Sequence, residues 1–284
     1  DKNEYEKNKF DNSKFILSDL NFFFEKMNKK KMKVKWNNWI QTCLKWKKIF
    51  HNKKDIINNS QKINLYDLSE VFSKILPSDA VFLCDSGFID VILPTNIKFR
   101  KKQICIHPVS QGSMGYALPA IIGAYSTGRK NIVSVVGDGS IMMNLQELQT
   151  IKYYKIPAKI FIINNNMYGI IRRRQKELFR GRTIGTDDGN GVGNPDFKKI
   201  SKAFDINYKL IKTKKNLKNE INDVLKQKKT IICEIIADEN QEYIEIGYAK
   251  NKQGKIVRRP LEDQKPFLDR NTFLREMIIE PIDQ

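Results

Sequence analysis

Residues 134–170, SVVGDGSIMMNLQELQTIKYYKIPAKIFIINNNMYGI, contain two β-branched runs, each followed at once by small or polar residues. The first run ends at Gly137, Asp138 and Gly139, and the second ends at three asparagines, residues 164–166. A strand, a glycine turn, an amphipathic helix and a second strand form a right-handed crossover. Both strand ends are therefore expected at the carboxyl edge of one parallel sheet, where open α/β sheets bind ligands.

The chemistry of these strand ends favours phosphate and a metal ion. Gly137 and Gly139 have no side chains, so backbone N–H groups can approach an anion, and a helix expected to begin near Ser140 adds its positive end. The carboxylate of Asp138 and an asparagine amide oxygen are hard ligands suited to a small divalent cation. Each motif alone is commonly an ordinary turn or loop. Together they predict a metal-diphosphate site.

Composition narrows the class of protein. With 284 residues and 40% hydrophobic content, the chain can bury a full core. The formal net charge is +19, but the lysines are scattered and form no basic block interleaved with aromatic residues, so solvated faces are expected rather than nucleic-acid binding. No apolar run approaches the roughly 18 residues of a membrane span and no charged leader opens the chain, so no membrane partner is expected.

The cysteines indicate the compartment. Cys43, Cys84, Cys105 and Cys233 show no CxxC spacing and mostly lie in apolar runs, which favours buried free thiols over disulfides or zinc ligands. A reducing environment, and hence the cytoplasm, is expected. Because residue 1 is Asp rather than Met, we expect the chain to be part of a longer protein.

Hydrophobic patterning predicts the organisation of the chain. Residues 1–30 suit a short strand and a helix, and residues 31–52 place apolar side chains at helical spacing, for which core packing is a commoner explanation than a membrane surface. From Ile63 onward, strands and helices alternate. This alternation predicts an α/β fold with a doubly wound, mostly parallel sheet and helices on both faces. Strands are predicted within the ranges 80–84, 104–106, 131–136, 158–163 and 230–236.

Three ordered motifs carry a resemblance to a known family. Between Gly139 and Asn164 lie 24 positions, and SQGSMGYALPAIIGA at residues 110–124 resembles a GxMGxxLPAAIGA segment. With the glycine and asparagine motifs, this segment makes the chain similar to acetolactate-synthase-like thiamine-diphosphate enzymes. The resemblance implies four parts: a remnant of a central domain at 1–30, a linker helix and linker at 31–62, the thiamine-diphosphate and Mg²⁺ domain at 63–248, and a carboxyl-terminal tail at 249–284.

The resemblance also implies a function. The chain would be the carboxyl-terminal part of a thiamine-diphosphate-dependent 2-keto acid decarboxylase and carboligase, with pyruvate as donor. In that family a glutamate from the pyrimidine-binding domain of a partner subunit activates the cofactor. The complete protein would then be a homo-oligomer, a dimer or tetramer, and this chain alone would be inactive. A catalytically silent cofactor-binding or regulatory module of the same fold stays open, whereas a dinucleotide-binding oxidoreductase would need a GxGxxG motif that the sequence lacks.

The resemblance also implies roles for individual residues, according to their positions in the matching motifs. The resemblance implies that Asp138, the Asn165 side chain and the Met167 carbonyl hold Mg²⁺, with Asn164 and Asn166 as supporting neighbours. The catalytic positions implied are the Gly112 carbonyl, which accepts a hydrogen bond from the cofactor's amine, and Met114, which keeps the two cofactor rings folded together. The cofactor-binding residues implied are Ser86, Gly112, Ser113, Met114, Gly137, Gly139, Ser140 and Asn165.

Several positions depart from the family pattern. Phe88, Ile89 and Asp90 replace polar residues near the diphosphate, so Ser86 is expected to make that contact alone. Arg174 lies where a tryptophan is usual, which favours an anionic or nucleotide-linked acceptor or, equally, a solvated arginine. Residues 180–197 are glycine-rich and have the texture of enzymes from surface-polysaccharide gene clusters. They predict either a mobile loop over the substrate or a plain surface loop. His107 either faces the cofactor or is structural.

Overall fold

The computed structural model describes residues 2–7, 12–30, 35–49, 62–108, 110–243, 248–250, 254–264 and 267–281. The chain divides into two compact units, Asp1–Asn52 and Lys53–Gln284. The described residues of the first unit form three helices, α1 (Lys2–Lys7), α2 (Leu20–Lys29) and α3 (Asn37–Ile49).

Helix α3 confirms the helix predicted within residues 31–52, but not its burial. None of the described side chains of α1, α2 or α3 is buried. Trp36 and Trp39 are 53% and 49% exposed, so the expectation that this apolar face packs into a core is wrong for the chain by itself. The strand predicted near residue 15 is also absent, because the described residues 13–19 are neither helix nor strand.

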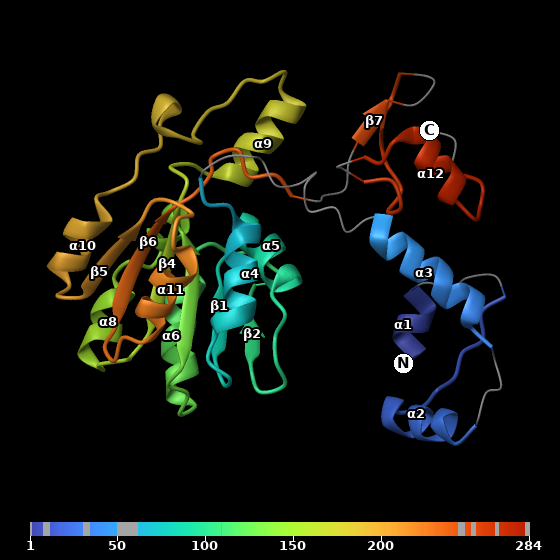
Figure 1. Cartoon of the computed structure of the whole chain (residues 1–284), viewed down its shortest axis with the longest axis horizontal. Coiled ribbons are helices and arrows are strands. Elements are labelled where there is room, and N and C mark those ends of the chain that lie inside the picture. The colour runs from blue at the N-terminus through green and yellow to red at the C-terminus, as the bar shows by residue number, and fades with distance from the viewer. Residues whose placement is uncertain are drawn as a thin grey trace. The chain divides into compact units, whose positions relative to one another are not determined.

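The second unit is built on a six-stranded parallel sheet with the order β2-β1-β3-β4-β6-β5 (Figure 1). The strands are β1 (Val81–Cys84), β2 (Ile104–Ile106), β3 (Ile132–Gly137), β4 (Lys159–Asn164), β5 (Asn207–Ile211) and β6 (Ile231–Ile236). Five of them lie where the sequence predicts strands. The edge strand β5 was not predicted, because only its last residue is buried and its polar residues mask the pattern.

Helices cover both faces of this sheet, as predicted. One core packs α4 (Leu65–Ile75), α5 (Phe88–Asn96) and α11 (Leu217–Leu225) against strand residues such as Phe82 and Phe161. The other core packs α6 (Ala117–Ser126), α8 (Glu147–Tyr153) and α10 (Phe197–Ala203) against the alternate strand residues, including Leu83 and Ile160. Strands buried on both faces explain the continuous β-branched runs of the sequence.

The described part of the second unit contains six further elements. They are α7 (Asp138–Ile141), α9 (Gly169–Leu178), the short 3-10 helix η2 (Asp188–Asn190), the antiparallel hairpin of β7 (Tyr248–Lys250) and β8 (Ile256–Arg258), and α12 (Arg270–Glu276). Two short strands, β7 and β8, thus follow residues 230–236, the last strand that the sequence predicts. Within the described ranges, no helix is long and apolar enough to cross a membrane.

Strand order places the candidate site. After β1 the chain adds β2 on one side, and β3 then pairs with β1 on the other side. The order of strands therefore reverses between β1 and β3, and such a switch point opens a crevice outside the carboxyl ends of its strands. Asp85 and Ser86 follow β1, and Asp138 follows β3, so these residues meet at that crevice.

Two local expectations need correction. The helix expected near Ser140 begins at Asp138 and is only four residues long, and α8 follows after a turn. A four-residue helix has only a weak dipole, so local N–H groups rather than a long helix are available to an anion. All four cysteines are free, but only Cys84 and Cys233 are buried; Cys105 is half-buried and Cys43 is exposed.

Candidate functional site

A cavity of about 410 Å³ lies at the crevice between the ends of β1, β3 and β4. Its walls contain nine of the residues that the sequence singles out: Ser86, Gly112, Met114, Gly137, Asp138, Gly139, Ser140, Asn165 and Met167. These residues come from three strand ends and one loop that are far apart in the sequence. Ser113 and Arg174 are not in the cavity wall.

Asp138 is the buried carboxylate of this cavity. Its side chain is 3% exposed and accepts hydrogen bonds from the backbone N–H groups of Gly139 (2.8 Å) and Asn166 (2.7 Å) and from Nδ2 of Asn194 (2.9 Å). Burial raises the pKa of the Asp138 carboxyl to about 6, although these hydrogen bonds oppose the shift. In the described part of the chain, no cationic side chain pairs with it. The ionised form therefore lacks a counter-charge.

The asparagine loop after β4 presents one free amide. Asn164 donates from Nδ2 to Oε1 of buried Glu234 at 2.6 Å and accepts from the Asn166 backbone at 3.0 Å. Asn166 adopts a left-handed conformation with φ 56°, which turns the chain so that its N–H faces Asp138. Among the described residues, none makes a hydrogen bond with the Asn165 side chain, which lines the cavity. Asn164 and Asn166 are thus supports, and Asn165 remains available to a ligand.

The donor set fits a small cation. Asp138, Asn165 and Met167 all line the cavity, and a carboxylate, a side-chain amide and a backbone carbonyl are the oxygen donors that these residues carry. The described residues contain no group of three His, Cys, Asp or Glu side chains that could hold a metal. A cation here would therefore keep open positions for phosphate oxygens and water, as Mg²⁺ does when it is bound through one or two carboxylates and a substrate phosphate. An uncompensated buried carboxylate also fits such an ion.

Within the glycine turn, Gly139 has no room for a side chain. A Cβ atom on Gly139 would lie 2.2 Å from Cε1 of Tyr168, so the aromatic ring packs directly on the backbone. The approach is possible only with glycine at this position. Gly137 and Gly139 both line the cavity, and the contact of this turn with an anion stays a prediction.

Asp85, which was not identified from the sequence, holds in place the loop of residues 112–115, here called the GSMG loop. Asp85 is fully buried and accepts backbone hydrogen bonds from Ser86 (2.9 Å), Gly115 (3.0 Å) and Ala117 (2.8 Å). Burial raises the pKa of the Asp85 carboxyl, while these hydrogen bonds lower it in part. In the sequence Asp85 looks like part of an ordinary DSG turn. Only the fold shows that it ties the end of β1 to the loop that carries Met114.

The GSMG loop reaches the cavity through Gly112 and Met114. Gly112 has φ +59°, a conformation that favours glycine, and Met114 is 43% exposed. An exposed methionine in a cavity wall is not a core residue, which is consistent with the role that the resemblance implies for it. Nearby, Nδ1 of His107 lies 2.6 Å from Oδ1 of Asp90. Asp90 lines the cavity but His107 does not, so His107 is connected to the cavity through its contact with Asp90.

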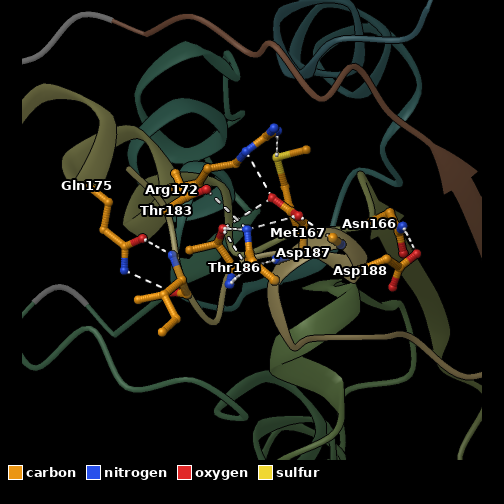
Figure 2. Close-up of polar contacts among 11 residues, drawn as sticks. Asn166, Met167, Arg172, Gln175, Thr183, Thr186, Asp187 and Asp188 are labelled. Carbon is orange, nitrogen blue, oxygen red and sulfur yellow. Dashed lines mark hydrogen bonds and ion pairs between the residues drawn. The ribbon is translucent and has the colours of Figure 1, made fainter. Parts of the chain in front are cut away.

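The glycine-rich loop folds onto α9 and the asparagine loop (Figure 2). Gln175 exchanges two hydrogen bonds with the backbone of Ile184, at 3.0 and 2.8 Å. Nε of Arg172 lies 3.0 Å from Oδ2 of Asp187. Arg174 points to Glu177, with 3.4 Å between Nη1 and Oε2. The loop is thus hydrogen-bonded along its length, and its closure over a substrate stays a prediction.

Comparison with known proteins identifies the family. Residues 85–235, just over half of the chain, match the family described as thiamine pyrophosphate enzyme, C-terminal TPP binding domain. The chain belongs to this family. The matched range begins at Asp85 and includes the whole glycine turn and the asparagine loop. It confirms the expected resemblance, and thiamine diphosphate is the cofactor of the matching domain.

Relatives and a solved structure agree with this assignment. The acetolactate synthase large subunit of Porphyra purpurea is 33% identical over 168 residues, which cover 58% of this chain and 28% of that protein. The acetolactate synthase isozyme 2 large subunit of Escherichia coli (strain K12) is 32% identical over 165 residues, which cover 57% of this chain and 29% of that protein. The large subunit of Lactococcus lactis is 23% identical over 256 residues, covering 89% and 44%. The chain therefore spans less than half the length of these relatives.

The solved structure supports the fold. A thiamine diphosphate-dependent 4-hydroxybenzoylformate decarboxylase from Rhodococcus jostii RHA1 matches with a TM-score of 0.58 and 22% sequence identity, over 66% of this chain and 34% of that one. A doubly wound α/β fold is thus common to both proteins.

Proposed function

We propose that this chain is the carboxyl-terminal, cofactor-binding part of an acetolactate-synthase-like enzyme that decarboxylates a 2-keto acid, with pyruvate as donor, and joins the remaining fragment to an acceptor. The observation that carries the proposal is the meeting of Asp138, Asn165, Met167 and the GSMG loop around one cavity. The acetolactate synthase relatives support the substrate class. Retention of both Asp138 and Asn165 argues against a silent module.

The residues of the cavity have separate tasks in this proposal. Asp138, Asn165 and the Met167 carbonyl would hold Mg²⁺, whose charge would offset part of the negative charge of the cofactor's diphosphate. Backbone N–H groups around Ser140 would contact the phosphate oxygens, while the Gly139 N–H donates to Oδ1 of Asp138. When bound, thiamine diphosphate supplies an electron sink for decarboxylation. The chain's own contribution is to bind and orient the cofactor and to exclude water from it.

The GSMG loop orients the reacting end of the cofactor. The Gly112 carbonyl would accept a hydrogen bond from the amine of the pyrimidine ring, and Met114 would keep the two rings folded together. Asp85 holds this loop against the end of β1, because it accepts hydrogen bonds from the backbone N–H groups of Gly115 and Ala117 and from that of Ser86 at its own strand end. Orientation of this kind is one of the larger contributions that a protein makes to catalysis.

The complete enzyme in this proposal is a homo-oligomer with the cofactor between subunits. The activating glutamate would come from a pyrimidine-binding domain. These 284 residues would then bind the cofactor but would not convert substrate by themselves. Arg174 would influence the acceptor rather than the donor. In the complete enzyme, Arg174→Trp should preserve pyruvate decarboxylation and shift products toward small 2-keto acid acceptors, and unchanged product ratios would remove Arg174 from acceptor choice.

Thermal unfolding tests the binding part of the proposal. Thiamine diphosphate should raise the melting temperature of the chain in the presence of Mg²⁺, and thiamine without its diphosphate should not, because a ligand that binds only the native state stabilises it. Lys198→Ala, on the exposed side of α10, is a matched control that should keep the full shift. Equal shifts with thiamine and thiamine diphosphate would contradict a diphosphate site.

A further inference from the structure

The two carboxylate oxygens of Asp138 have different environments. Oδ1 accepts a hydrogen bond from the N–H of the next residue, Gly139, at 2.8 Å, and the Met167 backbone N–H also hydrogen-bonds to this carboxylate. Oδ2 accepts two, from the Asn166 backbone at 2.7 Å and from Nδ2 of Asn194 at 2.9 Å. Oδ2 is therefore surrounded by donors, whereas Oδ1 keeps acceptor capacity for another ligand.

The direction of the Asn194 amide follows from its partners. Nδ2 donates to Asp138 and also lies 3.2 Å from Oδ1 of Asn166. Both partners are acceptors, so the opposite orientation of the amide would place an oxygen against a carboxylate and a carbonyl. Asn166 is itself held by Asp188, since its Nδ2 donates to Oδ2 of Asp188 at 2.6 Å (Figure 2).

The backbone around Asn194 is anchored by the start of α10. Pro195 follows Asn194 and favours an extended conformation at that residue. Asp196 caps the helix by accepting from the Lys199 N–H at 3.0 Å, and Phe197 is 2% exposed in the core. The Asn194 side chain therefore projects from the end of the glycine-rich loop that the start of α10 holds in place.

We propose that Asn194 is a positioning residue that decides which cation the site prefers. Asn194 takes the second acceptor position of Oδ2, beside the Asn166 N–H, so that together they leave Oδ1 as the carboxylate oxygen for a metal. Mg²⁺ requires near-octahedral geometry and is satisfied by a carboxylate that binds through one oxygen. Ca²⁺ accepts six to eight ligands and often takes both oxygens of a carboxylate. Blocking Oδ2 therefore disfavours Ca²⁺ relative to Mg²⁺. This inference rests on the proposed function, because it concerns the cation of that same site.

The test compares two cations in the same assay. Thiamine diphosphate is titrated calorimetrically into the chain with saturating Mg²⁺ or with Ca²⁺, and the ratio of the two dissociation constants is the readout. Asn194→Leu keeps the approximate shape of the side chain and removes its donor, and Asn194→Ala removes both. Lys198→Ala is the control. We expect the ratio to move toward Ca²⁺ by roughly tenfold in both Asn194 variants, the scale of one lost hydrogen bond to a charged group, and to stay unchanged in the control.

Each outcome has a distinct meaning. If affinity falls equally with both cations and the ratio is constant, Asn194 is merely structural and the inference is overturned. If the wild-type chain binds thiamine diphosphate with neither cation, the proposed function fails, and the inference fails with it. Should Asn194→Ala not fold, Asn194→Leu decides the question, since it conserves the packing volume.

Discussion

Replacement of Asp138 by asparagine should change the pH dependence of stability in a defined direction. The pKa of the carboxyl is raised from 3.8 to about 6 by burial, and the side chain is 3% exposed. A carboxyl whose folded pKa is raised stabilises the fold below its unfolded pKa, and that contribution is lost as the pH rises through the folded value. In the absence of a metal, stability due to Asp138 should therefore fall between about pH 4 and pH 7.

The size of the effect follows from the shift. A full shift of this size corresponds to about 3 kcal/mol, at about 1.36 kcal/mol per pKa unit. Between pH 4.5 and pH 7, a two-state titration delivers about 2 kcal/mol of that total. Asp138→Asn carries no titrating group, so the difference in unfolding free energy between the wild type and the variant should decrease by about 2 kcal/mol across this range.

Urea unfolding in EDTA at several pH values measures this difference, and other carboxylates cancel because both proteins contain them. Saturating Mg²⁺ with thiamine diphosphate should remove the loss of stability at pH 7, because the cation binds the ionised carboxylate. A wild-type to variant difference that stayed constant from pH 4.5 to pH 7 would refute the claim that this buried carboxylate lacks a counter-charge.

Three further substitutions separate cofactor binding from folding. Asn165→Ala should weaken Mg²⁺-dependent cofactor binding at least about tenfold, measured by calorimetry. The free energy of unfolding, measured in urea, should change by less than about 0.5 kcal/mol, since no described residue makes a hydrogen bond with this amide. A large loss of stability would contradict the claim that the Asn165 amide has no partner among the described residues. Asp85→Ala leaves three buried N–H groups without an acceptor and should cost about 3 kcal/mol or more in urea unfolding; a cost under about 1 kcal/mol would show that water replaces the carboxylate. Gly139→Ala should destabilise by about 1 to 3 kcal/mol because its Cβ meets the Tyr168 ring, and Tyr168→Ala in the same chain should restore most of it; additive losses in the double variant would contradict this contact.

The sequence predicts those site residues that are chemically distinctive and also lie directly after a predicted strand. Gly137, Asp138 and Asn165 follow β-branched runs, and parallel strands bring their ends to one edge, so their meeting requires no knowledge of the packing. Asp85 and Asn194 could not be found in this way. The Asp85 contacts span about thirty residues of sequence, and Asn194 reaches Asp138 across 56 residues. Such contacts depend on how the loops pack.

Burial was the least predictable property of the helices. The apolar spacing of α3 gives a helix, yet its side chains remain exposed in the chain by itself. A hydrophobic face shows that a helix packs against something but does not identify the partner. The edge strand β5 illustrates the reverse case, because backbone pairing with β6 forms it without a strong hydrophobic pattern.

The central claim is that one cavity binds thiamine diphosphate through a cation held by Asp138 and Asn165. Isothermal titration of the cofactor into the chain, with Mg²⁺ and then with EDTA, tests it most directly when Asp138→Ala is measured beside the wild type. The account predicts saturable binding to the wild type that disappears in EDTA and in Asp138→Ala. Binding that is equally tight in Asp138→Ala, or that is indifferent to EDTA, would contradict it.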